Sequence, residues 1–317
     1  SKGYDVGLFI QDEYAINPYL TLTPVLRWSY YNRKPTTDNN DKFGLASRSD
    51  NKVTPGITLT LSPSKQLSFY ASVQTGYRPP FLDELYTSIE YPEFGMYSVV
   101  LPNPDLKPEE SINVEIGVNG DYKNLFSDSD RFVFHANVFR DRVKNLINAG
   151  ATGDMDFTDD GDMILYYSID NVGKALKTGF EASADYYPGN ADFHLSYGYL
   201  HAEDKNTGEK IPGLTPMQAT LRAGYTYKPW NVNGWYRVRL FKGGKSNLET
   251  AWNSGEYKQL GGFATHTLGL TWKPQIKDWA DFTLTFSIDN ITNKKFRYLN
   301  GGYGVGRSYR AWLSATF

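Results

Sequence analysis

A strict alternation of apolar and polar residues recurs along almost the whole of this chain. In residues 282–289 it places two phenylalanines, a leucine and an isoleucine on one side of an extended strand, with three hydroxyls and a carboxylate on the other. Any β-sheet alternates in this way, so the period of two alone does not separate a soluble sandwich from a membrane barrel. The final segment, 309–317, ends on Phe317, which lies on the apolar side. Such an ending is typical of a membrane barrel strand.

The composition excludes a bundle of membrane helices. The mean hydropathy is -0.50, and no segment reaches the roughly 18 uncharged apolar residues that a spanning helix needs. A lipid-facing barrel is compatible with these values, because only alternate residues contact lipid while the others line a polar interior. The 24 tyrosines fit interfacial aromatic girdles. The net charge of -2 gives no support to nucleic-acid binding.

Alternation and turn residues together predict an all-β fold, a transmembrane antiparallel β-barrel with about thirteen strands in this chain. The outward-facing apolar sets are clearest in 20–30, 67–73 and 193–199. The predicted strands are 4–15, 19–33, 52–62, 66–77, 111–122, 130–147, 163–187, 191–203, 216–227, 231–242, 262–273, 280–293 and 308–317.

The connections between these strands alternate in length. Short turns such as 188–190 join one end of the strands, whereas long polar loops such as 78–110 and 148–162 join the other. Bacterial outer-membrane barrels have short periplasmic turns and long extracellular loops, so we expect the first strand to run towards the periplasm. We interpret 171–175 as a bulge within one long strand, 163–187, because a turn there would reverse the asymmetry downstream.

The predicted strand number is odd, whereas single-chain bacterial barrels have an even number. An odd number leaves the two termini on opposite sides of the membrane. We therefore predict that residues 1–317 form only part of a barrel, and that any export signal has been removed or lies outside this chain.

Two sequence boxes bracket the longest predicted loop. Tyr77-Arg78-Pro79-Pro80 opens it, and residues 103–109 (Asn-Pro-Asp-Leu-Lys-Pro-Glu) close it. The chain here resembles the TonB-dependent outer-membrane receptors, in which a Phe/Tyr-Arg-Ala-Pro box and an Asn-Pro-Asn/Asp-Leu-x-Pro-Glu box flank an extracellular loop; Pro79 replaces the usual alanine. Further stretches of familial type are 9–14, 171–175 with 179–181, 289–295, and 306–308 leading to Phe317.

The resemblance implies a barrel of about 22 strands with a plugged lumen. Residues 1–317 would be its C-terminal part, with the plug and the earlier strands outside this chain. The implied function is active transport of an iron complex across the outer membrane of a Gram-negative cell. The complex, or its carrier protein, would bind at the extracellular loops, and the TonB energy-transducing complex would act through the missing N-terminal region. No enzymatic activity is implied.

The paired boxes are best known in haem and haemoglobin receptors, where a histidine between them helps to bind haem. No histidine lies between the boxes here, but tyrosine and methionine are haem ligand types as well. Haem is therefore the leading ligand and a ferric siderophore the next, since related boxes also occur in siderophore and cobalamin receptors. The candidate ligand-binding residues are Tyr77, Arg78, Tyr86, Tyr91, Met96, Tyr97 and His201.

Each candidate also has a purely structural interpretation. The aromatic residues of the loop can simply pack it, and His201 can be a solvated residue at a strand end. The acidic segment 154–162 suggests calcium, but it lacks the bidentate Glu and the helices of an EF-hand, so a solvated loop is favoured. Arg237 and Arg239 have lumen-facing parity, where they could attract an anion or, as we prefer, pair with carboxylates of a plug.

Two other functions remain open from the sequence. A passive porin-like channel is the first alternative, and a plug with an energy-coupling box in the N-terminal region would argue against it. An outer-membrane hydrolase is the second. It would need a Ser or Asp beside His201, and the chain has no G-x-S-x-G, H-E-x-x-H or phosphate-loop motif.

Overall fold

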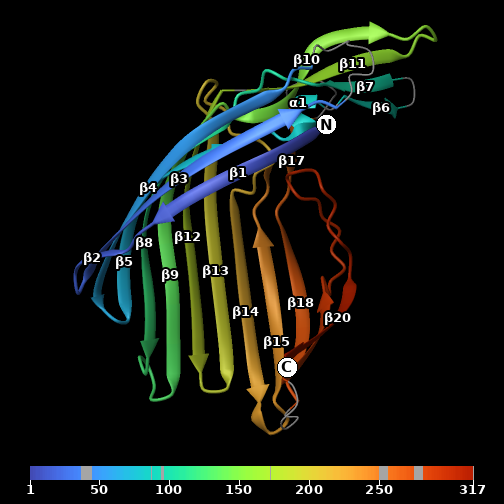
Figure 1. Ribbon diagram of the computed structural model, residues 1–317. Coiled ribbons are helices and arrows are strands. Elements are labelled where there is room, and N and C mark those ends of the chain that lie inside the picture. The colour runs from blue at the N-terminus through green and yellow to red at the C-terminus, as the bar shows by residue number, and fades with distance from the viewer. Residues whose placement is uncertain are drawn as a thin grey trace.

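The computed structural model describes residues 1–36, 45–86, 88–93, 96–171, 173–249, 256–274 and 281–316. Its main feature is one antiparallel sheet in which each strand pairs with the next barrel strand along the chain (Figure 1). Thirteen strands follow one another on this path within the described residues, which confirms the predicted number. They are β1 (Lys2–Gln11), β3 (Leu20–Lys34), β4 (Arg48–Ser64), β5 (Leu67–Arg78), β8 (Glu109–Lys123), β9 (Asp130–Lys144), β12 (Lys174–Pro188), β13 (Ala191–Asp204), β14 (Met217–Tyr227), β15 (Val232–Phe241), β18 (Phe263–Trp272), β19 (Asp281–Asp289) and β20 (Ser308–Thr316).

The register of this sheet collects apolar side chains on one face. Leu61 lies opposite Phe69, and Phe69 lies opposite Val118 on the next strand. Leu195 lies opposite Leu221 in the same way, and these two side chains are 44% and 45% exposed. A continuous exposed apolar face is what lipid tails require of a barrel wall. The predicted fold class, an incomplete transmembrane antiparallel barrel, is confirmed.

The opposite face is polar and internally hydrogen-bonded. The Tyr70 hydroxyl donates to the Glu115 carboxylate, and Asn137 Nδ2 donates to the same carboxylate at 3.1 Å. His135 Nδ1 lies 2.7 Å from Asn119 Oδ1, and its ring stacks on Tyr70 with centroids 6.2 Å apart. These side chains come from β5, β8 and β9, so the network crosses neighbouring strands. The polar face therefore lines the lumen.

The two chain ends lie at opposite ends of the strands (Figure 1). The N-terminus is at the end that carries the long loops, and β1 runs away from it towards the end with short turns. Gly189 forms part of such a short turn, with a φ of 66° that a side chain would disfavour. The first strand thus runs towards the short-turn end, and its direction relative to the periplasm stays a prediction. Among the described residues, no helix is long and apolar enough to cross a bilayer.

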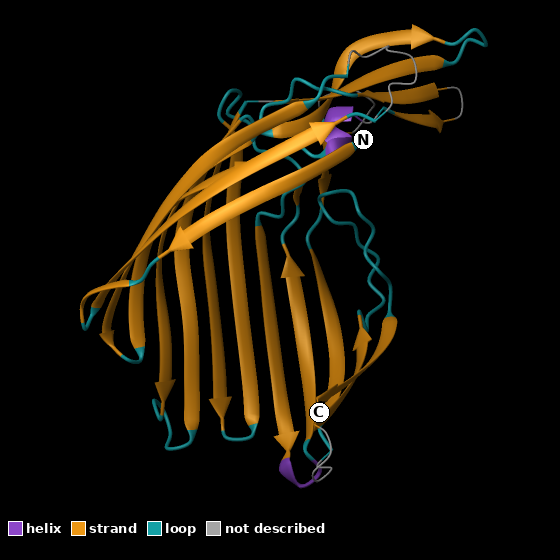
Figure 2. Ribbon diagram, viewed as in Figure 1, coloured by secondary structure: helices purple, strands orange, loops and turns teal. Residues whose placement is uncertain are grey.

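A second sheet stands above the loop end of the barrel wall (Figure 2). Its strand order is β10-β11-β7-β6, with β11 and β7 parallel and the other pairs antiparallel. Apart from β11, the sequence pattern predicts irregular loops for this region. The elements here are α1 (Leu82–Tyr86), β6 (Ile89–Glu93), β7 (Met96–Leu101), β10 (Ile147–Phe157) and β11 (Met163–Asn171).

The interpretation of 163–187 as one bulged strand is wrong. β11 ends at Asn171 in the upper sheet, and β12 begins at Lys174 in the barrel wall. Gly173 has a φ of 111°, and the Asn171 side chain donates to two backbone carbonyls, of Lys107 and Asn145. The chain thus changes sheets here. The barrel still has short turns at one end and long loops at the other, because the extra strand lies outside the barrel.

Other predicted boundaries also shift. The segment 4–15 is divided between β1 and β2 (Tyr14–Asn17), both of which pair with β3. The segment 130–147 ends at Lys144, because Asn145 has a φ of 55° and breaks the strand before β10. The loop 243–261 contains a short hairpin of β16 (Gly244–Glu249) and β17 (Tyr257–Leu260). A three-residue 3-10 helix, Lys228–Trp230, forms the turn before β15. Phe317 lies outside the described residues.

The assignment of faces predicts opposite effects for neighbouring residues of β14. Leu221→Arg places a charge against lipid, and we expect it to lower the free energy of unfolding of the full-length receptor in liposomes by about 2–4 kcal/mol. Thr220→Arg, one residue away, points to the lumen and should cost much less. Urea-induced unfolding followed by tryptophan fluorescence measures both. Equal losses would contradict the assignment.

Candidate ligand-binding site

Arg78 joins the two sequence boxes at the base of the upper sheet. Its Nη1 donates to both carboxylate oxygens of Glu84 at 3.0 Å, and its Nη2 donates to Glu109 at 2.6 Å. Glu84 also accepts the Phe81 N–H at 2.7 Å, and the guanidinium lies 5.2 Å from the centre of the Phe81 ring. Both carboxylate side chains are less than one-fifth exposed. The arginine of the first box therefore clamps the start of the loop to its end.

The second box bonds to the segment that follows β10. Asn103 Nδ2 donates to the Ile169 carbonyl at 2.8 Å and to Asp170 at 2.7 Å. Asn171 accepts the Lys107 N–H at 2.8 Å and donates to the Lys107 carbonyl at 2.9 Å. Two motifs that are far apart in the sequence are thus hydrogen-bonding partners. These hydrogen bonds fix the end of β11, in the upper sheet, to the second box, which directly precedes the barrel strand β8.

A small apolar core lies beneath these contacts. Leu85, Leu106 and Ile147 are buried against one another, with Tyr86 and Ile169 packed beside them. These residues come from α1, the second box, β10 and β11. The two loop segments 78–110 and 147–171 therefore share one core and form a single unit.

Two candidate tyrosines are engaged in holding this unit. The Tyr77 hydroxyl donates to Asp50 Oδ2 at 3.1 Å. The Tyr86 hydroxyl lies within donating distance of two backbone carbonyls, Arg33 at 3.0 Å and Ala46 at 2.9 Å. Burial raises the pKa of Tyr86, which disfavours the phenolate that would bind iron. In this structure both residues, with Arg78, brace the base of the loop.

The remaining candidates lie in three different elements. Tyr91 is in β6, Met96 and Tyr97 are in β7, and Tyr97 is half-buried. His201 is in β13, where it shares the parity of Tyr199 and faces the apolar side; its Nε2 lies 3.4 Å from Glu203. None of the contacts within the described residues joins His201 to the loop candidates. The structure brings Tyr77, Arg78 and Tyr86 together at one base and leaves His201 apart.

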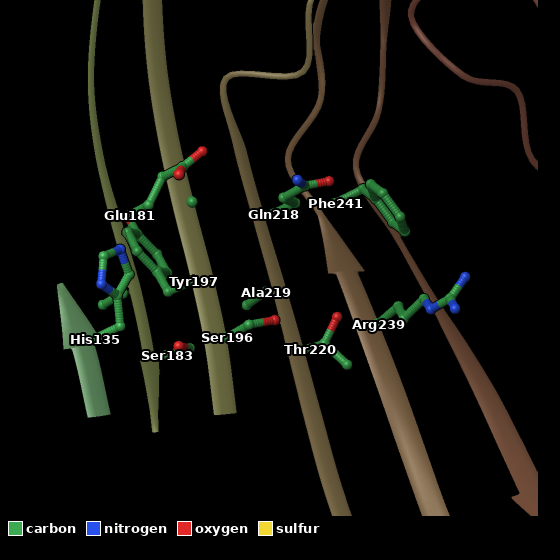
Figure 3. A pocket seen from close by; sticks show the side chains of 12 residues that line it. His135, Glu181, Ser183, Ser196, Tyr197, Gln218, Ala219, Thr220, Arg239 and Phe241 are labelled. Carbon is green, nitrogen blue, oxygen red and sulfur yellow. The ribbon is translucent and has the colours of Figure 1, made fainter. Parts of the chain in front are cut away.

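A lumen-facing cavity of about 440 Å³ lies further down the wall (Figure 3). Polar side chains from five strands reach it, together with the aromatic rings of Tyr197 and Phe241. Sequence reasoning selected only Arg239 of this group, although the alternation of each strand assigns most of the others to the lumen. The principal lining side chains are His135, Glu181, Ser196, Gln218, Thr220, Arg239 and Phe241.

Arg239 is the unpaired cation of this cavity. Its neighbour on the same face, Arg237, donates to Asp289 at 3.3 Å, whereas Arg239 makes no hydrogen bond or ion pair within the described residues. Phe241 stacks on Phe263 with centroids 4.7 Å apart, and Phe263 stacks on Phe296 at 4.1 Å. A free guanidinium beside stacked rings offers both charge and a flat apolar surface to a ligand.

The described carboxylates and histidines do not form a metal centre. No group of three or more such side chains is arranged to hold an ion anywhere in the described residues. The aspartates of 154–162 form no such group in this structure.

Comparison with known proteins decides the family. Residues 1–291 match the family model described as "TonB dependent receptor-like, beta-barrel". This chain is a TonB-dependent receptor barrel. It is 24% identical over 294 residues to the Heme/hemopexin utilization protein C of Haemophilus influenzae strain 86-028NP, covering 88% of this chain and 38% of that protein. It is 26% identical over 260 residues to the Hemoglobin and hemoglobin-haptoglobin-binding protein A of Haemophilus influenzae, covering 75% of this chain and 22% of that protein. The chain thus spans less than half the length of these relatives.

Solved structures of receptor barrels have the same fold. The ferric enterobactin receptor of Pseudomonas aeruginosa superposes with a TM-score of 0.71 at 19% identity, over all of this chain and 45% of that one. The FrpB iron transporter of Neisseria meningitidis superposes with a TM-score of 0.67 at 18% identity, over 98% of this chain and 45% of that one. The family and these solved neighbours are named as receptors and transporters, not as enzymes, so no comparison supports the hydrolase alternative.

The Arg78 clamp predicts a local rather than a global effect of mutation. Arg78→Met leaves two poorly exposed carboxylates without their cation, and we expect the upper sheet to open more easily by about 1–3 kcal/mol. Hydrogen exchange of segments 82–86 and 96–106 should accelerate, while exchange in β13 stays unchanged. Arg140→Met is the matched control, because Arg140 is exposed and makes no ion pair within the described residues. Unaltered exchange in Arg78→Met would refute the clamp.

Proposed function

We propose that the whole protein is an active-transport receptor of the Gram-negative outer membrane that imports an iron complex, with haem first and a ferric siderophore second. Residues 1–317 supply the C-terminal part of its barrel. The energy comes from the TonB complex, acting through a region outside this chain. The carrying observation is the unpaired Arg239 beside stacked aromatic rings in the lumen of a receptor barrel.

The open edges of the sheet support the assignment to part of a larger barrel. Within the described residues β1 pairs only with β3, and β20 pairs only with β19. A free strand edge facing hydrocarbon leaves amides and carbonyls without partners, at a cost of several kcal/mol each. This supports our proposal that further strands complete the wall, and barrels of about 22 strands are the size typical of outer-membrane transporters.

Two features favour haem over other complexes. The relatives include proteins whose names state binding or use of haem, hemopexin and haemoglobin. Haem is a planar ring with two carboxylates, which suits a guanidinium next to an aromatic stack such as Phe241, Phe263 and Phe296. Ferric siderophores are commonly anionic as well, so the same residues serve the second ligand class.

The candidate residues of the loop take two roles in this proposal. Tyr77, Arg78 and Tyr86 hold the upper sheet in place through their existing bonds. Tyr91, Met96 and Tyr97 lie in the strands β6 and β7 of that sheet and are proposed to meet the incoming ligand or its carrier. His201 is proposed as a contact at the barrel rim. Binding and a conformational step complete the transport, with no bond broken.

Haem titration of the full-length receptor tests this proposal. We expect a sharp Soret shift, and we expect Arg239→Gln to weaken haem binding about tenfold through the loss of one charge-assisted hydrogen bond. Tyr91→Phe and Tyr97→Phe should change the band if either phenol binds iron, whereas Tyr86→Phe should not. Arg140→Gln, which lies on the apolar face opposite Val114, is the control.

Three outcomes would reverse parts of the proposal. A receptor that shows no Soret shift but binds a ferric catecholate would replace haem by a siderophore. Steady ion conductance through the full-length protein, without a requirement for TonB, would support the passive channel instead. An Arg239→Gln variant with unchanged affinity for both ligands would remove the lumen cavity from the binding site.

A further inference from the structure

The upper sheet carries a single sign of charge. Its two hairpin segments, 87–101 and 146–171, contain eight carboxylates and no Lys, Arg or His. None of the six aspartates in 146–171 forms an ion pair within the described residues. Since the whole chain has a net charge of only -2, this acidity is local. The acidic residues are Glu90, Glu93, Asp154, Asp156, Asp159, Asp160, Asp162 and Asp170.

This charge is opposite to what an anionic iron complex requires. The upper sheet offers haem carboxylates and ferric siderophores no electrostatic attraction of its own, so any contact with Tyr91, Met96 or Tyr97 there would rest on other interactions, whereas Arg239 in the lumen attracts them. A second copy of this chain would be repelled, because it would bring the same aspartates. A cationic protein segment, in contrast, would be drawn to the sheet, and its approach would be faster at low ionic strength.

The two edge strands of the upper sheet differ in how well they are protected against pairing with a further strand. β6 forms one edge and contains Pro92 between two glutamates, a composition that blunts strand pairing. β10 forms the other edge and projects from the barrel along its length (Figure 1). Its eleven residues include neither Pro nor Lys. Within the described residues, β10 pairs with β11 and leaves its second side unpaired.

Hydrogen bonds at both ends of β10 show which amides are free. The Ile147 N–H donates to the Glu109 carboxylate at 2.9 Å, so it points away from β11. Beyond the register shift, the Thr158 N–H donates to the Asp162 carbonyl at 2.8 Å, so it points towards the partner strand. Because antiparallel pairs alternate, the amides of Ala149 and Met155 point away from β11. They form part of a template for an added strand.

Apolar side chains accompany this edge. Met155 and Phe157 are 59% and 61% exposed and share one face of β10, since they lie opposite Leu165 and Met163 of β11. An added strand would cover part of both side chains. Main-chain hydrogen bonds would then supply affinity and alternate side-chain contacts would supply specificity.

We propose that β10 is a strand-addition site that captures an extended, Lys- or Arg-bearing segment of a carrier protein. That the captured protein carries the iron complex follows only from the proposed function, and on this one point the inference rests on it. The upper sheet thus binds the carrier, and the lumen cavity binds the released complex. The Arg78 clamp and the Asn103 contacts hold the edge at a fixed place above the barrel mouth.

A short basic peptide tests this directly on the full-length receptor in nanodiscs. The probe is a fluorescein-labelled peptide of alternating Lys and Val, seven residues long, followed by fluorescence anisotropy at low salt. We expect binding, slower deuterium exchange in segment 147–157, and a loss of affinity of about tenfold or more in Ala149→Pro, which removes an outward amide. A peptide N-methylated on alternate residues should not bind.

Charge variants separate strand addition from simple attraction. Asp156→Asn with Asp159→Asn should weaken peptide binding and flatten its salt dependence, whereas Asp128→Asn, an exposed carboxylate in a turn at the opposite end of the barrel, should do neither. Absence of peptide binding would overturn the inference. So would equal binding of the N-methylated peptide or full affinity in Ala149→Pro.

Haem titration of the same variants keeps the two proposals apart. Ala149→Pro should bind haem with unchanged affinity, which also shows that the variant is folded. If the receptor binds the peptide at β10 but neither haem nor a ferric siderophore, the proposed function fails and the strand-addition site stands. If it binds haem but not the peptide, the strand-addition site fails and the proposed function stands.

Discussion

The pairing of every backbone amide and carbonyl in hydrocarbon is the constraint on which this structure depends. Lipid offers no hydrogen bonds, so each wall strand must pair with a neighbour along its length. That requirement sets the long antiparallel ladder from β1 to β20 and the short turns between many of its strands. It also sorts the side chains, because a strand with one apolar and one polar face can pair in only one register. The lumen network and the lipid face both follow from it.

The loop motifs of this family have a plain physical meaning in this molecule. Arg78 of the first box bonds to Glu109 of the second, and Asn103 and Asn171 join the second box to the end of β11. The residues that make the family visible in the sequence are therefore mostly partners in one hydrogen-bonded brace. The boxes therefore report on how the loops are held. This explains why the boxes identify the family more securely than the cargo.

The wall could be predicted from the sequence, whereas the upper sheet could not. Alternation over ten or more residues fixes both strand and face, so the parity of Arg237 and Arg239 followed from the sequence alone. β10 has glycine, alanine and aspartate in place of such alternation, and its pairing with β11 places it outside the barrel. The break at Asn171 was misread for the same reason: Asn and Gly suit a bulge and a sheet change equally, and only the contacts with Lys107 and Asn145 distinguish them. The lumen cavity needed the register of five strands at once.

The parallel pairing of β7 with β11 couples two excursions of the chain that leave the wall at different points. A residue inserted or deleted in either strand would shift the register of the pair by one residue and turn the buried Leu165 outwards. These strands are therefore expected to change length only together, as one structural unit. The tip at 158–162 has no such tie, because its bonds are local. Its length and sequence can therefore vary, and a tag or label can be introduced there without disturbing the upper sheet or the barrel wall.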